Sequence, residues 1–182
     1  MANTVTNVTV GKPSIGGAIW RAPLGTTLPT DTTTALDAAF KCLGYCSEDG
    51  LTNSNSPETE AIKAWGGDTV LQVLESKDDT FTFTLIEAMN IDVLKTVYGD
   101  DNVTGTLSTG LTIKANSTPA DAACYVIDMV YNNSHVKRIT IPSAYVSEVG
   151  DITYTDGEAV GYETTLSCTP DAQGNTHYEY IK

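Results

Sequence analysis

The stretch "TVLQVLESKDDTFTFTLIEA", Thr69–Ala88, decides the fold class because its apolar and polar residues alternate. Phe81, Phe83 and Leu85 fall on one side of an extended chain, with threonines between them. Alternation of this kind is typical of a half-buried β-strand rather than a helix. A short charged segment, Glu75–Asp79, separates the two alternating runs, and it predicts the turn of a β-hairpin.

The same alternation recurs downstream and predicts further strands at 106–114, 124–132, 136–146 and 160–168. A helix is predicted near residues 90–98, because Asn90 can cap its start and Gly99 can end it. The apolar spacing in 35–43 predicts one or two further helical turns, and the polar segment 47–60 is interpreted as a loop. The expected fold is mainly β, a β-sandwich or barrel with one flanking α-helix.

The N-terminal region differs from the rest of the chain. Two short strands are predicted within it, but Gly25–Thr34 has no periodicity, and Pro23 and Pro29 punctuate the segment. We therefore expect residues 1–34 to form an extended arm and residues 35–182 to form the β domain. An arm of this kind can lie along a neighbouring subunit and become ordered on contact.

The chain of 182 residues has ten basic and twenty-three acidic residues, a net charge of −13. Tight binding to nucleic acid is not expected, because it requires cations that neutralise phosphates. The sequence shows no basic and apolar leader and no apolar run of about 20 residues, so neither secretion nor membrane insertion is expected. In a reducing cytoplasm the cysteines are expected to be free thiols: Cys42, Cys46, Cys124 and Cys168.

Residues that could carry catalysis are sparse. His135 and His177 are the only histidines, and both are expected to be solvated. No GxSxG motif accompanies them, and the spacing of Cys42 and Cys46 is not that of a zinc site. The sequence therefore predicts no enzyme, no metal and no cofactor, and assembly remains as the function.

Several motifs occur in a characteristic order: "APLGTTLP" at Ala22–Pro29, "LGY" at Leu43–Tyr45, the predicted hairpin, and "LKTVYG" at Leu94–Gly99. In this order the chain resembles the major tail tube proteins of tailed bacteriophages, of the type with long non-contractile tails. The resemblance covers roughly residues 15–145. It implies a structural virion protein of the tail, assembled in the host bacterial cytoplasm, whose hexameric rings stack into a hollow tube. Double-stranded DNA would pass through that tube without tight binding.

The resemblance also implies partners and contact regions. The partners would be other copies of the chain, together with tape measure, tail terminator and baseplate or tip proteins. The residues expected to contact neighbouring subunits or rings are Ala22, Pro23, Leu24, Gly25, Thr26, Pro29, Glu75, Lys77, Asp78 and Asp79. Two alternatives stay open on the sequence alone. One is a β-sandwich binding module, such as a capsid decoration protein or an adhesin domain, and the other is the inner-tube subunit of a contractile injection system.

Overall fold

The computed structural model describes residues 3–132 and 135–182, and most of their regular structure is β-strand. The strands are β1 (Lys12–Pro13), β2 (Ile19–Pro23), β3 (Lys41–Cys42), β4 (Cys46–Lys63), β5 (Thr69–Leu85), β6 (Val103–Thr106), β7 (Gly110–Ile113), β8 (Ala123–Val130), β9 (Val136–Val149), β10 (Tyr162–Cys168) and β11 (Tyr178–Ile181). One α-helix, α1 (Ile91–Tyr98), and two short 3-10 turns, η1 (Val5–Asn7) and η2 (Asp100–Asn102), complete the described elements. The expectation of a mainly β fold is confirmed.

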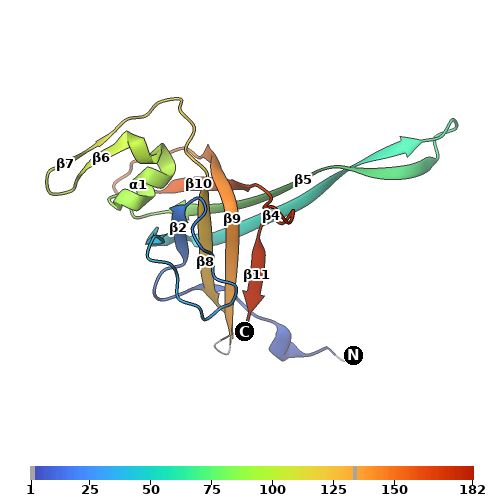
Figure 1. Ribbon diagram of the computed structural model, residues 1–182, viewed down its shortest axis with the longest axis horizontal. Coiled ribbons are helices and arrows are strands. Elements are labelled where there is room, and N and C mark those ends of the chain that lie inside the picture. Colours follow the sequence, from blue (N-terminus) through green and yellow to red (C-terminus); the bar gives the residue numbers. More distant parts are fainter. Residues whose placement is uncertain (1–2, 133–134) are drawn as a thin grey trace.

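Nine strands form one sheet, in the order β3-β2-β8-β9-β10-β5-β4, with β1 joined to β8 and β11 joined to β9. The pairings in this sheet are antiparallel. The long strand β9 pairs with β11 through its first half and with β10 through its second half. In Figure 1 β8 and β9 stand upright while β5 and β10 cross behind them, so β9 connects two parts of the sheet that run in different directions.

The main core lies between these parts of the sheet and α1. Alternate residues of the central strands supply it, among them Phe81, Phe83 and Leu85 from β5 and Ile139 and Ile141 from β9. The helix is capped as predicted, because the Asn90 side chain accepts a hydrogen bond from the Asp92 amide at 3.0 Å. Residues just after the helix are tied to the sheet by two hydrogen bonds of 3.0 and 2.8 Å from Arg21 to the Asp100 carboxylate.

The predicted strands at 124–132, 136–146 and 160–168 correspond to β8, β9 and β10. The turn expected between the first two includes residues 133–134, which lie outside the described residues. The segment 106–114 is not one strand, because a turn at 107–109 divides it between β6 and β7. The helical turns expected at 35–43 are also wrong. Phe40 and Leu43 are buried, but they lie in irregular segments immediately before and after the short strand β3.

Part of the predicted N-terminal arm belongs to the body of the molecule. Strand β2 pairs with β8 from Ile19↔Ile127 to Pro23↔Ala123, and a smaller apolar cluster joins the following loop to this edge. The buried Arg138 holds that loop, since its Nη1 donates to the carbonyls of Asp31 and Thr34 at 3.1 and 2.7 Å. The segment 24–34 therefore lies against its own chain. The boundary at residue 34 stays a prediction.

Candidate assembly surface

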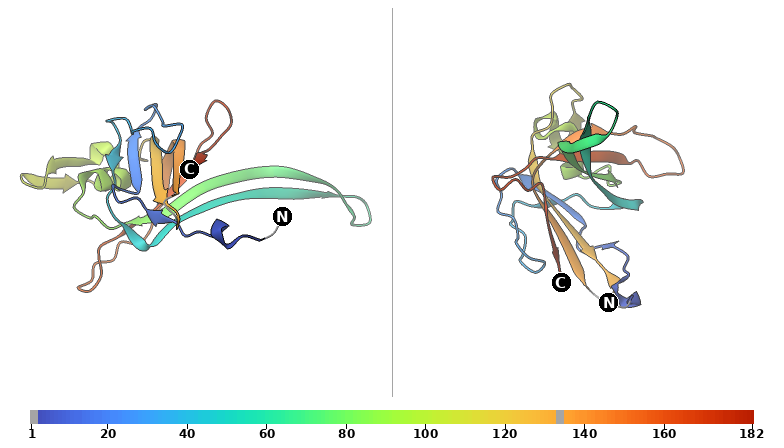
Figure 2. Two further views of the ribbon diagram at one scale, coloured as in Figure 1. Left: turned by 90° about the horizontal axis from the view of Figure 1, so that it is seen from below. Right: turned by 90° about the vertical axis from the view of Figure 1, so that its right-hand side faces the viewer.

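The β4–β5 hairpin is the feature that separates this molecule from a closed globular domain. Strand β5 pairs with β10 only from Thr80 to Leu85, whereas its pairing with β4 continues outward to Thr69. Beyond Thr80 the two strands have only each other as neighbours in the sheet, and Figures 1 and 2 show them leaving the body as a curved ribbon. At roughly 3.3 Å per residue, the unsupported segment Thr69–Asp78 spans about 30 Å.

The hairpin turn lies elsewhere than the sequence predicted. Glu75–Asp79 is continuous strand within β5, and the segment interpreted as a polar loop, 47–60, lies within β4. The turn itself is formed by Ala64–Asp68, where the Ala64 amide donates to the Asp68 carbonyl at 2.8 Å. Register shifts at Glu58/Thr59 and Ile62/Lys63 mark bulges, which increase the twist of a two-stranded ribbon and bend it.

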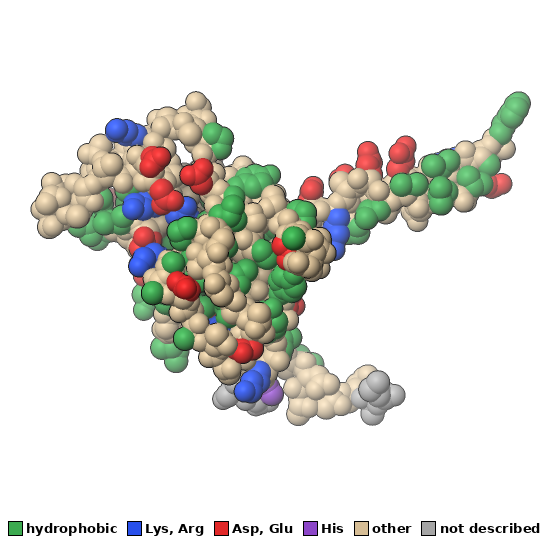
Figure 3. All heavy atoms as spheres, viewed as in Figure 1, with side chains coloured by type: hydrophobic (Ala, Val, Ile, Leu, Met, Phe, Trp, Pro, Cys, Tyr) green, Lys and Arg blue, Asp and Glu red, His purple; other side chains and the backbone are tan. Residues whose placement is uncertain are grey.

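Apolar side chains occupy both faces of the outer hairpin. Ile62 lies opposite Leu71 on one face, and Leu74 lies opposite Thr59 on the other. The exposed large apolar residues of this region are Ile62, Trp65, Val70, Leu71, Val73 and Leu74. Figure 3 shows hydrophobic side chains gathered on the outer half of the ribbon, with acidic ones beside them. A narrow ribbon with these side chains uncovered on both faces has the character of an interaction surface.

The hairpin is fixed to the body at its root by a buried carboxylate. The Asp79 side chain is fully buried, and it accepts hydrogen bonds from Asn53 at 2.8 Å and Thr176 at 2.5 Å. His177 Nδ1 lies 2.5 Å from the same carboxylate and donates to it, since an ionised carboxylate can only accept. The His177 ring also meets Phe81 edge to face, with the centroids 5.3 Å apart. These contacts join the segment before β11 to the point where the ribbon leaves the body.

The charge state of Asp79 follows from these contacts. Burial by itself opposes ionisation, but the hydrogen bonds from Thr176, Asn53 and His177 outweigh it and lower the pKa of the Asp79 carboxyl.

The contacts of His177 with Asp79 and Phe81 show that the expectation of a solvated His177 is wrong. Asp79 cannot lie on an exposed hairpin tip, because strand β5 buries it in the body.

The other predicted contact residues divide into two groups. Glu75, Lys77 and Asp78 are exposed on the shaft of the hairpin, and Pro23, Leu24 and Gly25 are exposed at the end of β2 and just after it. Thr26 is half-buried, and its hydroxyl donates to the Pro23 carbonyl at 2.7 Å, whereas Ala22 and Pro29 are buried within their own chain. The contact role of all these residues stays a prediction. The exposed apolar residues of the outer hairpin were not among the predicted contacts.

The chain matches the family model described as "Phage tail tube protein" over residues 2–182. It is a member of the phage tail tube protein family. No curated protein shows significant similarity to the chain. The family match extends beyond the region of motif resemblance and includes the C-terminal residues that hold Asp79.

Membership in the tail tube family makes this chain a structural, non-enzymatic subunit of a virion tail. No cluster of three His, Cys, Asp or Glu side chains is placed to bind a metal ion in the part of the chain that the structure describes. None of the described helices has the length and apolar character needed to cross a membrane. The uncovered hairpin is accordingly interpreted as a surface for assembly.

Proposed function

We propose that this tail tube subunit closes into hexameric rings, that the rings stack into a hollow tube, and that double-stranded DNA passes through the tube. The observation that carries the proposal is the outer β4–β5 hairpin, which exposes apolar side chains on both faces and contributes none to its own core. A neighbouring subunit is the partner that covers it. The ring number of six rests on the resemblance to tail tube proteins.

The remaining partners follow from the same proposal. The ends of the tube contact tail terminator and baseplate or tip proteins, and the lumen holds a tape measure protein before the DNA passes. Assembly takes place in the cytoplasm of the host bacterium. The exposed residues at the end of β2 and just after it, among them Pro23 and Leu24, form a second contact with a neighbouring subunit or ring.

Removing the outer hairpin tests the proposal directly. We expect a variant in which Asn-Gly replaces Pro57–Lys77 to fold normally and to form no rings or tubes. The deleted side chains are exposed apart from the half-buried Ser76, and Asn-Gly suits a two-residue turn between the opposed Ser56 and Asp78. Thermal unfolding should shift by only a few degrees, while negative-stain microscopy at high concentration should show tubes for the unaltered chain alone.

The outcome discriminates among the functions that the sequence left open. A truncated chain that still forms tubes of normal diameter would contradict the role of the hairpin. An unaltered chain that stays monomeric at every concentration would instead favour a binding module.

The inner wall of the tube is expected to carry acidic and neutral polar side chains. Duplex DNA bears one negative charge per roughly 1.7 Å of its axis, and a basic wall would hold it. The chain itself has a net charge of −13, so each added subunit strengthens the negative field within a narrow channel. The structure of the assembled tube checks this expectation, and a net-positive inner wall would refute it.

A further inference from the structure

The tip of the hairpin presents a single large aromatic side chain. Trp65 is 108% exposed, which is the full exposure of an extended reference residue. The tight turn around it is set by Gly66 and Gly67, both with positive φ, and by the Gly67 amide, which donates to the Ala64 carbonyl at 3.0 Å. Residues with this exposure and size are typical anchors of protein interfaces, because the indole buries a large area with few rotatable bonds.

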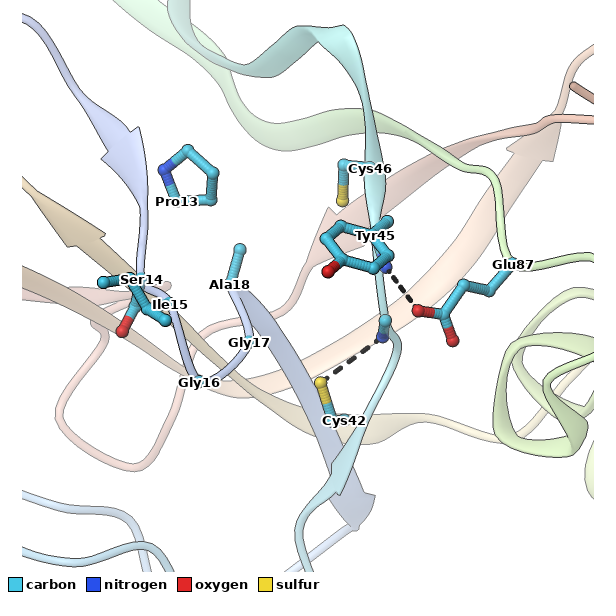
Figure 4. Close-up of a pocket in the computed structure, with 11 residues that line it drawn as sticks. Pro13, Ser14, Ile15, Gly16, Gly17, Ala18, Cys42, Tyr45, Cys46 and Glu87 are labelled. Atoms are coloured by element: carbon cyan, nitrogen blue, oxygen red, sulfur yellow. Dashed lines mark hydrogen bonds between the residues drawn. The ribbon is translucent and has the colours of Figure 1, made fainter. Parts of the chain in front are cut away.

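A pocket lined mainly by apolar side chains and glycines lies on the body of the same molecule. It has a volume of about 490 Å³ and is formed between Pro13–Ala18 and the segment from Cys42 to Cys46, with Glu87 at one end. Figure 4 shows these two segments facing each other across the pocket. The exposed side chains of Ile15 and Tyr45 line the pocket, and its lining also includes Gly16, Gly17 and Gly44, which have no side chain to occupy it. A Cβ atom added at Gly16 would meet no heavy atom within 4 Å.

The indole of Trp65 cannot enter the pocket of its own chain. The pocket includes Cys46, the first residue of β4, whereas Trp65 follows Lys63, the last residue of that strand. At roughly 3.3 Å per residue, β4 measures about 55 Å along its length, and its two ends lie at opposite ends of the hairpin. A contact between tip and pocket therefore joins two copies. Since it uses different surfaces on each copy, it propagates along a row of subunits instead of closing a pair.

Charge is compatible with contact between these two surfaces. Two copies with a net charge of −13 each repel one another, but the tip segment Lys63–Asp68 contains one lysine and one aspartate and has no net charge. The pocket contributes one carboxylate, Glu87, which accepts from the Tyr45 amide at 3.1 Å and from Asn90 at 2.9 Å. Among residues 3–132 and 135–182 no cation forms an ion pair with Glu87. Lys63 lies two residues before Trp65 and is the cation of the tip segment that can pair with Glu87 of another copy.

We propose that Trp65 of one subunit inserts into the Pro13–Ala18/Cys42–Cys46 pocket of another subunit, with Lys63 placed near Glu87. The proposal rests on the proposed function, because it identifies the contact through which the hairpin joins subunits. If Trp65 inserts into this pocket, tube formation requires both the pocket and the hairpin tip, although the two lie at opposite ends of β4.

Two substitutions test the contact from its two sides. Trp65→Ala removes the anchor, and Gly16→Leu adds a bulky side chain to the pocket lining at a position where a Cβ atom meets no heavy atom within 4 Å and φ is not positive. Each should raise the protein concentration needed for tube formation by about 30-fold or more, the effect expected for an aromatic anchor. The matched controls are Tyr154→Ala, at another exposed aromatic residue, and Gly157→Leu, at another glycine with open space around its Cβ position. These controls should assemble normally.

Crosslinking supplies a readout that does not depend on tube formation. Cys42 and Cys46 line the pocket, so Ala64→Cys places a thiol close to them in the contact and keeps the Trp65 anchor. Burial raises the pKa of the Cys46 thiol to about 11, so an added oxidant such as copper phenanthroline is used at alkaline pH. We expect a ladder of disulfide-linked oligomers, with the bond mapped to residue 64 and Cys42 or Cys46 by mass spectrometry. The ladder should disappear when both pocket cysteines are serine.

The outcomes separate this inference from the proposed function. If the unaltered chain forms tubes and both Trp65→Ala and Gly16→Leu form them equally well, the tip-to-pocket contact is refuted while the tube function stands. If a ladder forms through cysteines other than Cys42 and Cys46, the contact site is wrong. If the unaltered chain never forms rings or tubes, both proposals fail together.

Discussion

A proline in place of Phe83 is expected to abolish folding, and with it all assembly. Phe83 lies in the middle of the supported half of β5, opposite Leu51 of β4 and Thr164 of β10, and its ring is buried. Truncating a buried phenylalanine costs about 3–5 kcal/mol, and proline also removes a backbone donor within the sheet. The sum approaches the total stability of a typical domain, about 5–15 kcal/mol. Circular dichroism and thermal unfolding measure the loss.

A proline on the outer hairpin is the matched control. Val70→Pro lies at the bulge between the pairs Lys63↔Thr69 and Ile62↔Leu71, where the side chain is exposed. We expect this variant to keep the unfolding temperature of the unaltered chain. A Phe83→Pro chain with a native spectrum and cooperative unfolding would show that the root of the hairpin is not part of the core.

Replacing Asp79 with alanine is expected to destabilise the fold by about 3 kcal/mol at neutral pH, because three side-chain donors lose this buried acceptor. The donors are the side chains of Asn53, Thr176 and His177. The loss should loosen the hairpin root and the segment before β11 together. Hydrogen exchange at β11 and denaturant unfolding measure the two effects, and Asp78→Ala, at the exposed neighbouring position, should change neither.

The same contacts predict how stability depends on pH. The pKa of the Asp79 carboxyl is lower in the folded chain than in the unfolded chain. Its contribution is therefore fully present above the unfolded pKa, about 4, and is lost as the pH falls through the lower folded pKa. The stability difference between the unaltered chain and Asp79→Ala should shrink on acidification below about pH 4. A difference that stays constant over this range would mean that the carboxylate charge contributes nothing.

The supported strands could be predicted from the sequence because each buries one face. Phe81, Phe83 and Leu85 alternate with half-buried threonines, and β8, β9 and β10 carry comparable apolar runs. The helix was predictable for a local reason, since Asn90 and Gly99 act within one turn of its ends. These signals depend on near neighbours in the chain, so they can be detected without knowledge of the fold.

Strand β4 could not be predicted in this way. Its outer part is exposed on both faces, so its side chains show no alternation, and Pro57 suggests a loop. A proline is nevertheless compatible with this position, because β4 is an edge strand and has a partner on one side only. The turn was misplaced for a related reason. The charged segment Glu75–Asp79 resembles a turn in the sequence, but the chain reverses at Gly66-Gly67.

The buried Asp79 shows where sequence reasoning ends for the candidate site. An aspartate in a charged run and a histidine near the C-terminus have no detectable relation in the sequence. They meet because β5 and the segment before β11 approach in space, 98 residues apart in the chain. The proposed tip-to-pocket pair cannot be detected in the sequence for a different reason. Nothing in the local pattern connects Trp65 with Gly16, because the proposed contact joins two copies of the chain.

The proposed assembly through the uncovered hairpin also has a consequence for the timing of polymer growth. Two free subunits that meet through a single ribbon lose their independent translation and rotation, a cost of about 4–15 kcal/mol, and gain only one contact. A subunit that joins a preformed edge gains contacts on several sides for the same loss. Growth by such a ribbon is therefore nucleated: below a critical concentration the subunits remain dispersed, and a template determines where and when a polymer begins.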